Sequence, residues 1–333
     1  MVETATIADA APRSIEITES GDLLVRWVDA ELSVDGGDHV SIYPATWIRD
    51  HDYSNGLRRE RVEPVLWDAS ASHELAHADY PVLLADPVMK ASWMSRFRDR
   101  GVAFLHDVPT EPGTVARVAA QFGEVRTTGW GTVFDVRAAA DANSVAYTNL
   151  PLVTHTDEAY RDPAPTIQLQ HFLRADADGG ETTLVDGFQV AADLRAERPD
   201  LFELLTTVSL HFHFRDDSNE HEHDAPVIEL DTAGEVRAVR YSNHSVQPFL
   251  LPADEMEAYY DAYVMFGRRR ESDRYRVTMK LGVGDLYIVD NRRVLHGRTG
   301  FRSGGERHLQ SCYIERDEFM SRLRMMTREH DLL

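Results

Sequence analysis

Segments with the character of β-strands dominate the sequence from about residue 130 to residue 314. "TIQLQHFL" and "ERHLQSCYIER" are examples, and turns that contain glycine separate such segments. Two helical patterns interrupt the series, at about residues 187–206 and 253–270. A chain with many strands and few crossover helices folds into a β-sandwich or barrel, and not into a doubly wound sheet. We therefore expect a mainly β fold with flanking helices.

The strand-like pattern also extends toward the N-terminus, where we expect a domain boundary near residue 80. Residues 1–80 predict a small N-terminal β-rich domain that begins with a hairpin around Gly21. Residues 81–333 form the main domain, which opens with a helix that ends at Gly101. The apolar stripe of this helix consists of Val88, Met89, Trp93 and Phe97.

The charge balance limits the partners of the chain. With 56 acidic against 35 basic side chains, the formal net charge is −21, which argues against nucleic acid or an anionic membrane. The single cysteine, Cys312, excludes a disulfide within the chain and any cysteine-based metal site. No apolar run approaches the roughly 18 residues of a membrane helix, and the first residues do not resemble a secretory signal. We expect a cytoplasmic protein that acts on a small molecule.

The segment "VTHTDEAY" places His155 and Asp157 two positions apart. Residues i and i+2 of a strand point the same way, so this pair can supply two ligands to one metal ion. The same spacing occurs at His77 and Asp79, which makes the pattern weak evidence by itself. With Fe(II) as the trial metal, a facial triad needs a second histidine from a distant strand. His296 offers it in "VDNRRVLHGRTGF", at the end of an apolar strand.

At this point the sequence resembles a known family. The segments "NSVAYTNLPLVTHTDEAY", "GGETTLVDGFQV", "DNRRVLHGRTGF", "RHLQSCYIERD" and "MSRLRMM" are similar to the taurine dioxygenase-type Fe(II)/2-oxoglutarate-dependent dioxygenases. Within that family the chain most resembles the gamma-butyrobetaine dioxygenase-like enzymes. The resemblance implies a double-stranded β-helix (jelly-roll) core with His155, Asp157 and His296 as iron ligands. The pair at His77 and Asp79 is then expected in a solvated loop.

The resemblance also implies 2-oxoglutarate and O2 as co-substrates. In the family, an arginine on the strand after the second histidine binds the far carboxylate of 2-oxoglutarate, and Arg307 matches it. Its guanidinium can grip a carboxylate through two hydrogen bonds and does not lose its charge. Thr182 matches a hydroxyl that completes the pocket in related enzymes. Arg298 and Arg302 flank the same loop and are the competing candidates.

Four aromatic positions match the cage that holds a trimethylammonium group in the gamma-butyrobetaine dioxygenase-like enzymes. The attraction is that of a cation for ring faces. Strand alternation puts Tyr313 on the same face as Arg307, which favours one position independently. Any single aromatic residue could equally belong to an ordinary core. The four positions are Trp130, Phe134, Tyr147 and Tyr313.

The other end of the substrate site departs from the family pattern. Two asparagines that help bind the carboxylate of gamma-butyrobetaine match Asn243 and Ser144, with Asn143 beside the latter. Glu158 follows the metal-binding aspartate, where the carnitine-forming enzymes have tyrosine. A carboxylate here would repel an anionic tail. Our hypothesis is that the substrate keeps a quaternary-ammonium end but has a neutral, shorter or hydrogen-bond-donating tail.

The function that these features favour is Fe(II)- and 2-oxoglutarate-dependent hydroxylation of a small quaternary-ammonium compound, gamma-butyrobetaine or a close analogue. One alternative is a specialised-metabolism oxygenase that acts on another amine or small molecule. Another is a catalytically silent jelly-roll binding or sensor protein. The resemblance also suggests a homodimer. Because "WIRDHDYSNG" lacks the cysteines of the zinc site in eukaryotic members, we expect no zinc in the N-terminal domain.

The run "RDDSNEHEHDAP", residues 215–226, has the composition of an exposed loop. His221, His223 and Asp224 offer a second metal site as one interpretation. We favour a loop that covers the active site, because the run lies between expected core strands.

Overall fold

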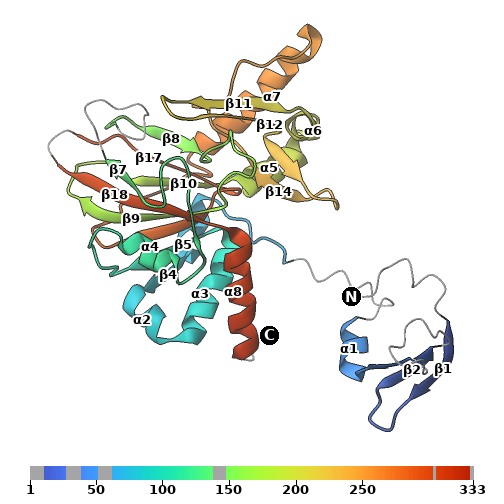
Figure 1. The fold of residues 1–333 in the computed structure, drawn as a ribbon. Helices are drawn as coiled ribbons and strands as arrows, with labels where there is room; N and C mark the ends of the chain where they lie inside the picture. The colour runs from blue at the N-terminus through green and yellow to red at the C-terminus, as the bar shows by residue number, and fades with distance from the viewer. Residues whose placement is uncertain (1–10, 28–38, 52–61, 138–147, 303–304, 331–333) are drawn as a thin grey trace. The chain divides into compact units, whose positions relative to one another are not determined.

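The structure of the chain, a computed structural model, divides into two compact units, residues 1–63 and 64–333. Figure 1 draws both units. The residues that the structure describes are 11–27, 39–51, 62–137, 148–302 and 305–330.

The N-terminal unit contains the predicted hairpin. Gly21 turns the chain with a φ of 86°, in the left-handed region that glycine adopts freely. Among the described residues of this unit, Val25 is the one buried side chain. The unit consists of an antiparallel sheet and a short helix: β1 (Pro12–Ile17), β2 (Leu23–Trp27), β3 (Val40–Tyr43) and α1 (Ala45–Asp50).

The boundary between the two compact units lies after residue 63, whereas the sequence predicts a domain boundary near residue 80. The reason is β4 (Ala76–Asp79), which pairs in parallel with β5 (Val102–His106) and so belongs to the larger unit. His77 and Asp79 therefore lie on an edge strand and not in a loop, although both side chains are exposed. A four-residue polar strand has no local signature, because its partner is distant in sequence.

Two sheets form the core of the larger unit, as the strand-rich sequence predicts. In the larger sheet the order is β4-β5-β16-β9-β18-β6, with β7 also paired to β18, and in the smaller it is β15-β10-β17-β8. The remaining strands of the larger sheet are β6 (Val125–Arg126), β7 (Phe134–Arg137), β9 (Ile167–Ala175), β16 (Leu286–Asp290) and β18 (Arg307–Ile314). Those of the smaller sheet are β8 (Leu152–His155), β10 (Thr182–Asp186), β15 (Val277–Met279) and β17 (Val294–Arg298).

An apolar cluster joins the facing sides of the two sheets. Phe172, Tyr287 and Leu309 come from the larger sheet, while Leu184 and Val294 come from the smaller. All of them are nearly or fully buried. Burial of apolar surface between two sheets is the main stabilising term in such a fold.

Helices cover the outer side of the larger sheet (Figure 1). Phe97, Val118 and Phe319 from three of these helices pack in one cluster with Leu169 and Ile288 of the sheet. Both faces of β9 are therefore buried, and its apolar positions need not alternate. The helices are α2 (Tyr80–Ala85), α3 (Pro87–Arg100), α4 (Thr114–Ala119) and α8 (Arg316–Glu329), and a short 3-10 helix, η3 (Ala69–Glu74), precedes them.

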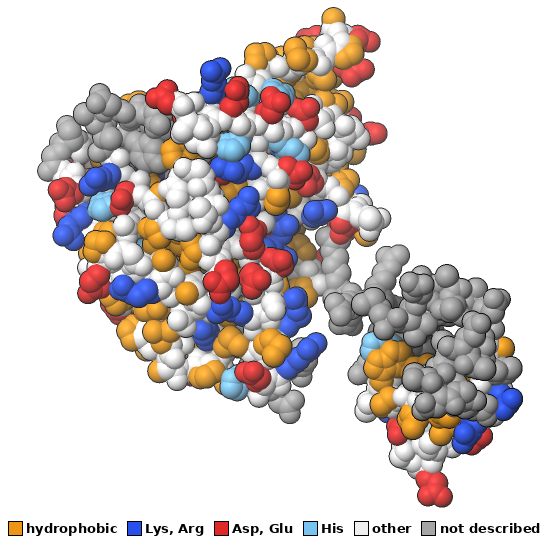
Figure 2. All heavy atoms as spheres, viewed as in Figure 1, with side chains coloured by type: hydrophobic (Ala, Val, Ile, Leu, Met, Phe, Trp, Pro, Cys, Tyr) orange, Lys and Arg blue, Asp and Glu red, His pale blue; other side chains and the backbone are white. Residues whose placement is uncertain are grey.

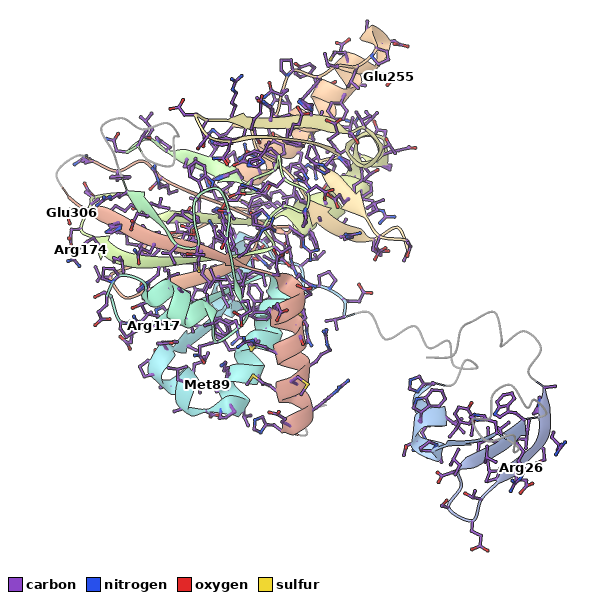
Figure 3. The ribbon with its side chains drawn as sticks, viewed as in Figure 1. Arg26, Met89, Arg117, Arg174, Glu255 and Glu306 are labelled. Atoms are coloured by element: carbon purple, nitrogen blue, oxygen red, sulfur yellow. The ribbon has the colours of Figure 1, made fainter. Side chains whose placement is uncertain are left out.

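Helix α3 ends at Gly101 as predicted, with a φ of 76° at that glycine. Its predicted stripe is half wrong, because Trp93 and Phe97 are buried but Val88 and Met89 are exposed. Met89 lies on the outer side of the helix (Figure 3). The buried face instead continues through Ala91 and Met94, which are both buried and lie three positions apart, as neighbours on one face of a helix do.

The helix expected over residues 187–206 is two helices, α5 (Gly187–Glu197) and α6 (Pro199–Thr207). Pro199 starts the second, because proline lacks the N–H that would continue the first. The helix expected over residues 253–270 is α7 (Ala253–Glu271). These helices share a cluster with three short strands and with residues on β10 and β17. The strands are β11 (Leu210–Arg215), β13 (Ile228–Leu230) and β14 (Val236–Val239).

Residues 215–226 are not an exposed loop, which corrects the prediction. They contain β12 (Glu220–Ala225), which pairs antiparallel with β11. The charged side chains that suggested a loop form ion pairs on one face of this hairpin. The pairs are His211–Asp224, at 2.7 Å, and His213–Glu220, at 3.0 Å. A two-stranded ribbon with a polar face therefore has the same polar composition as an exposed loop.

Within the described residues, the helices are too short or too polar to cross a lipid bilayer. On the face of the larger unit shown in Figure 2, acidic and basic side chains are interspersed. The net negative charge of the chain is therefore not gathered into one acidic field on that face.

Candidate metal and substrate site

The predicted histidines and aspartate meet at the edge of the smaller sheet. His155 ends β8, and His296 on β17 is its direct cross-strand partner. Asp157 follows two residues after His155, and the ligand atoms of the three side chains all lie within 4.8 Å of one another. Nε2 of His155 is 3.2 Å from Oδ1 of Asp157, and Nε2 of His296 is 3.5 Å from the same oxygen. Two nitrogens and one oxygen thus converge on one point.

The surroundings of Asp157 hold its carboxylate in place. Its Oδ2 accepts hydrogen bonds from Nε2 of Gln168, at 2.6 Å, and from the hydroxyl of Tyr313, at 2.8 Å. Asn291 accepts from the Asp157 N–H at 2.7 Å and donates to its carbonyl at 3.0 Å. Because these donors occupy Oδ2, Oδ1 is the oxygen that faces the histidines. Such outer partners orient the ligands of metal sites.

The orientation of His155 also suits a metal. Its Nδ1 lies 3.0 Å from the carbonyl of Val153, and that hydrogen bond needs a proton on Nδ1. The lone pair of Nε2 then points toward Asp157. Two neutral imidazoles and one carboxylate, with one side facing a cavity, are the donor set that Fe(II) takes in facial-triad sites. The residues present therefore fit the metal.

Within the described residues, these three are also the one group of three side chains with suitable ligand spacing. His221, His223 and Asp224 do not form a second. Alternation along β12 turns His221 toward Tyr160, whose ring it stacks on at 6.0 Å, while Asp224 pairs with His211 on the other face.

A cavity of about 170 Å³ lies against the three metal-binding side chains. Its polar wall includes Arg298 and Arg307, together with Tyr287. Its other described lining is rich in aromatic rings and includes Glu158. The cavity thus has cationic groups for an anionic co-substrate and ring faces for an apolar or cationic substrate.

The structure distinguishes among the three arginines that the sequence offers as candidates for binding 2-oxoglutarate. Arg307 and Arg298 line the cavity, whereas the side chain of Arg302 is 86% exposed and pairs with Asp178 at 3.3 Å. Burial lowers the pKa of Arg307, whose Nε donates to the carbonyl of Gly180 at 3.3 Å. The exposure of its side chain thus argues against Arg302 as the residue that binds 2-oxoglutarate.

Arg298 connects the cavity to the chain that leads into β8. Its guanidinium donates to the carbonyl of Leu150 and, at 2.6 Å, to that of Thr148. Burial, and after it the charge of Arg307, lowers the pKa of Arg298 to about 10. Two guanidinium groups close enough to influence each other favour an anion between or beside them.

Thr182 is the cross-strand partner of Arg298 and is buried. Its hydroxyl has no hydrogen-bond partner among the described residues. It is not among the described residues that line the cavity. A buried hydroxyl without a partner is one that a ligand can satisfy.

Three of the four predicted cage positions line the cavity: Trp130, Phe134 and Tyr313. The rings of Phe134 and Tyr313 lie 5.5 Å apart. Alternation along β18 does bring Tyr313 and Arg307 to the same cavity, as the sequence predicts. Tyr147 and Ser144 lie outside the described residues.

Two aromatic residues of the cavity were missed by the sequence analysis. Tyr160 and Phe214 stack with their centroids 4.9 Å apart, and Phe214 also lies 5.6 Å from Trp130. Phe214 comes from β11, so the β11–β12 hairpin supplies part of the cavity wall. The alternation of "LHFHF" could have indicated one apolar face, but not the surface that it covers.

Asn243 is exposed, and its Oδ1 accepts a hydrogen bond from the hydroxyl of Tyr263 at 2.7 Å. It does not line the cavity, whereas its neighbours Ser242, His244 and Ser245 do. The ring of His244 lies edge-on to that of His155, with centroids 5.7 Å apart. The cavity residue in this segment that lies beside a candidate metal ligand is therefore His244, and not the predicted Asn243.

Glu158 lines the cavity and is buried. Its backbone has a φ of 48°, in the left-handed region, which is unusual for a residue other than glycine. Burial raises the pKa of Glu158 to about 7, although the nearby Arg161 opposes this. The two side chains form an ion pair within one turn of chain.

Comparison with known proteins adds independent information. Residues 64–313 match the family model "Taurine catabolism dioxygenase TauD, TfdA family". The chain is 37% identical over 323 residues to gamma-butyrobetaine dioxygenase from Pseudomonas sp. (strain AK-1). The aligned region covers 96% of this chain and 82% of the relative. It is 28% identical to trimethyllysine dioxygenase from Meyerozyma guilliermondii, over 87% of this chain and 77% of the relative.

Among solved structures, the chain is similar to asparagine oxygenase, determined in complex with Fe(II), a hydroxyasparagine and succinate. The TM-score is 0.56 at 20% sequence identity, over 70% of this chain and 81% of that one. At this identity the likeness concerns the fold, and it confirms the predicted jelly-roll core.

Proposed function

This chain belongs to the TauD, TfdA family of taurine catabolism dioxygenases, and on that premise we propose that it hydroxylates a small quaternary-ammonium compound. The enzyme class is that of Fe(II)- and 2-oxoglutarate-dependent dioxygenases. The observation that carries the proposed substrate class is the set of aromatic rings beside the metal-binding side chains. They line a cavity whose arginines we assign to the co-substrate.

His155, Asp157 and His296 would hold the iron. When bound, Fe(II) supplies the activation of O2 that couples decarboxylation of 2-oxoglutarate to oxidation of the substrate. We assign the far carboxylate of 2-oxoglutarate to Arg307, with the hydroxyl of Thr182 as a further donor. Gln168 and Tyr313 keep the Asp157 carboxylate turned toward the metal.

The aromatic side chains would bind the cationic end of the substrate. A quaternary ammonium has no N–H, so hydrogen bonds cannot hold it, and ring faces that exclude water are the groups that attract it. Trp130, Phe134 and Tyr313 match the cage of the family, and Tyr160 and Phe214 extend the same wall. The two relatives are named for gamma-butyrobetaine and trimethyllysine, which both carry a trimethylammonium group.

Succinate formation tests this function. The enzyme, supplied with Fe(II), 2-oxoglutarate and O2, is incubated with a panel of trimethylammonium compounds and with primary amines of the same chain length. We expect succinate and hydroxylated product with at least one trimethylammonium compound. The His296→Ala variant, which lacks a metal ligand, should form neither product.

Two results would replace the proposal. Turnover of primary amines alone would favour an oxygenase for another class of amine. An enzyme that binds trimethylammonium compounds but never forms succinate would be a binding protein with a silent site. The accompanying proposal, a homodimer, rests on the family resemblance, and sedimentation equilibrium of the purified protein tests it separately.

A further inference from the structure

Glu158 is a buried carboxylate with unused capacity to accept hydrogen bonds. Its side chain is 4% exposed, and it lines the cavity. Neither carboxylate oxygen accepts a well-aligned hydrogen bond from a described residue, although the guanidinium of Arg161 lies against Oε2. The two oxygens of a carboxyl group offer several acceptor sites, and one ion pair leaves most of them open.

Glu158 lies in the wall of the cavity that we assign to the substrate. It directly follows Asp157, and its left-handed backbone sets the turn after β8. The N–H of Arg161 donates to the carbonyl of Glu158 at 3.0 Å, which closes that turn. Tyr160 and Tyr313 are buried and line the same cavity.

The partner for this acceptor cannot be the quaternary nitrogen, which has no N–H to donate. A substrate carboxylate has no proton to donate, so at this wall it would leave the buried acceptor unsatisfied. A hydroxyl or an amine elsewhere on the substrate would instead satisfy a buried acceptor. A structural ion pair with Arg161 explains the charge balance of Glu158 but not its place in the cavity wall.

We propose that Glu158 is a specificity-determining residue that accepts a hydrogen bond from an O–H or N–H group of the substrate. The preferred substrate is then a quaternary-ammonium alcohol or amine, and not a betaine that ends in a carboxylate. This inference rests on the proposed function, because it takes the quaternary-ammonium end as given.

The test compares two substrates that differ at one end: gamma-butyrobetaine and the trimethylammonium alcohol of the same carbon chain. For the wild-type enzyme we expect kcat/KM to favour the alcohol by at least about tenfold, because a buried acceptor discriminates strongly between donors and anions. The Glu158→Gln variant keeps the size of the side chain but lacks its charge. It should lose most of this preference, chiefly through KM.

The control is Glu197→Gln, which removes a carboxylate from the Arg269 ion pair on the surface, at 2.7 Å, and should leave the preference unchanged. Dissociation constants of both compounds, measured without oxygen, should follow the same order. Thermal melting identifies a variant that fails to fold, and in that case the wild-type ratio of dissociation constants decides alone. A wild-type preference for gamma-butyrobetaine overturns the inference but leaves the proposed function standing. Failure of every trimethylammonium compound overturns the proposed function instead.

Discussion

Gln168 on β9 and Tyr313 on β18 are direct cross-strand partners, and both donate a hydrogen bond to the same oxygen of Asp157. The larger sheet thereby fixes a candidate metal ligand that follows a strand of the smaller sheet. The register of β9 against β18 places the two donors side by side. The geometry of the metal site therefore depends on the pairing of strands that supply no ligand themselves.

Tyr313→Phe should weaken Fe(II) binding about tenfold, because partners that orient a metal ligand typically contribute 10- to 100-fold to affinity. The ring remains, so packing against Phe134 is kept. Titration of the protein with Fe(II) in the absence of oxygen measures the change. Tyr275→Phe is the matched control, since its hydroxyl binds Asp193 away from the cavity. Equal Fe(II) affinity of Tyr313→Phe and wild type would contradict the role of the hydroxyl.

Arg307→Lys should raise KM for 2-oxoglutarate by roughly 10- to 100-fold, because lysine cannot reproduce the two parallel hydrogen bonds of a guanidinium to a carboxylate. Arg302→Lys is the control and should leave KM unchanged, since Arg302 is exposed. Initial rates at varied 2-oxoglutarate measure both. A large effect at Arg302 and none at Arg307 would reverse the assignment.

His171 should make the fold sensitive to acid. It is fully buried on β9, and burial lowers its pKa to about 4. Because the unfolded chain has a histidine pKa near 6.5, the unfolded state binds a proton first as pH falls. The free energy of unfolding from this group is complete above about pH 6.5 and decreases by up to about 3 kcal/mol toward pH 4.

Urea unfolding of wild type and His171→Gln at about pH 7 and about pH 5 measures this contribution. The wild type should lose more stability between the two conditions than the variant does. His308→Gln is the control, since His308 is partly exposed and pairs with Asp135 at 2.6 Å. Parallel losses in wild type and His171→Gln would show that His171 does not cause the acid sensitivity.

The sequence predicted which three side chains converge better than it predicted their surroundings. His155 and Asp157 could be recognised because a two-residue spacing on an extended segment has a fixed geometric meaning. The turn that begins at Glu158 breaks that alternation with a φ of 48°. Beyond Glu158, odd and even positions no longer indicate which way a side chain faces. For that reason the sequence did not indicate Tyr160 as a cavity residue.

Pairing between distant segments explains the other differences. β4 and β12 have few apolar residues, so only their partners β5 and β11 make them strands. Asn243 was expected at the substrate, but the chain after β14 turns its side chain toward Tyr263 on α7. In each case the deciding contact joins residues that no local pattern connects.

Phe214 provides the last prediction, because it tests whether the β11–β12 hairpin belongs to the substrate site. Phe214→Ala should raise KM for a trimethylammonium substrate by about tenfold, since it removes a ring face that stacks on Tyr160 and contacts Trp130. KM for 2-oxoglutarate should stay the same, because neither Phe214 nor the two rings that it contacts are assigned to 2-oxoglutarate. Phe249→Ala is the control, since that ring packs against Tyr259 and Tyr263 and does not line the cavity. If Phe214→Ala alters both Michaelis constants equally, the hairpin supports the whole fold and not the substrate wall.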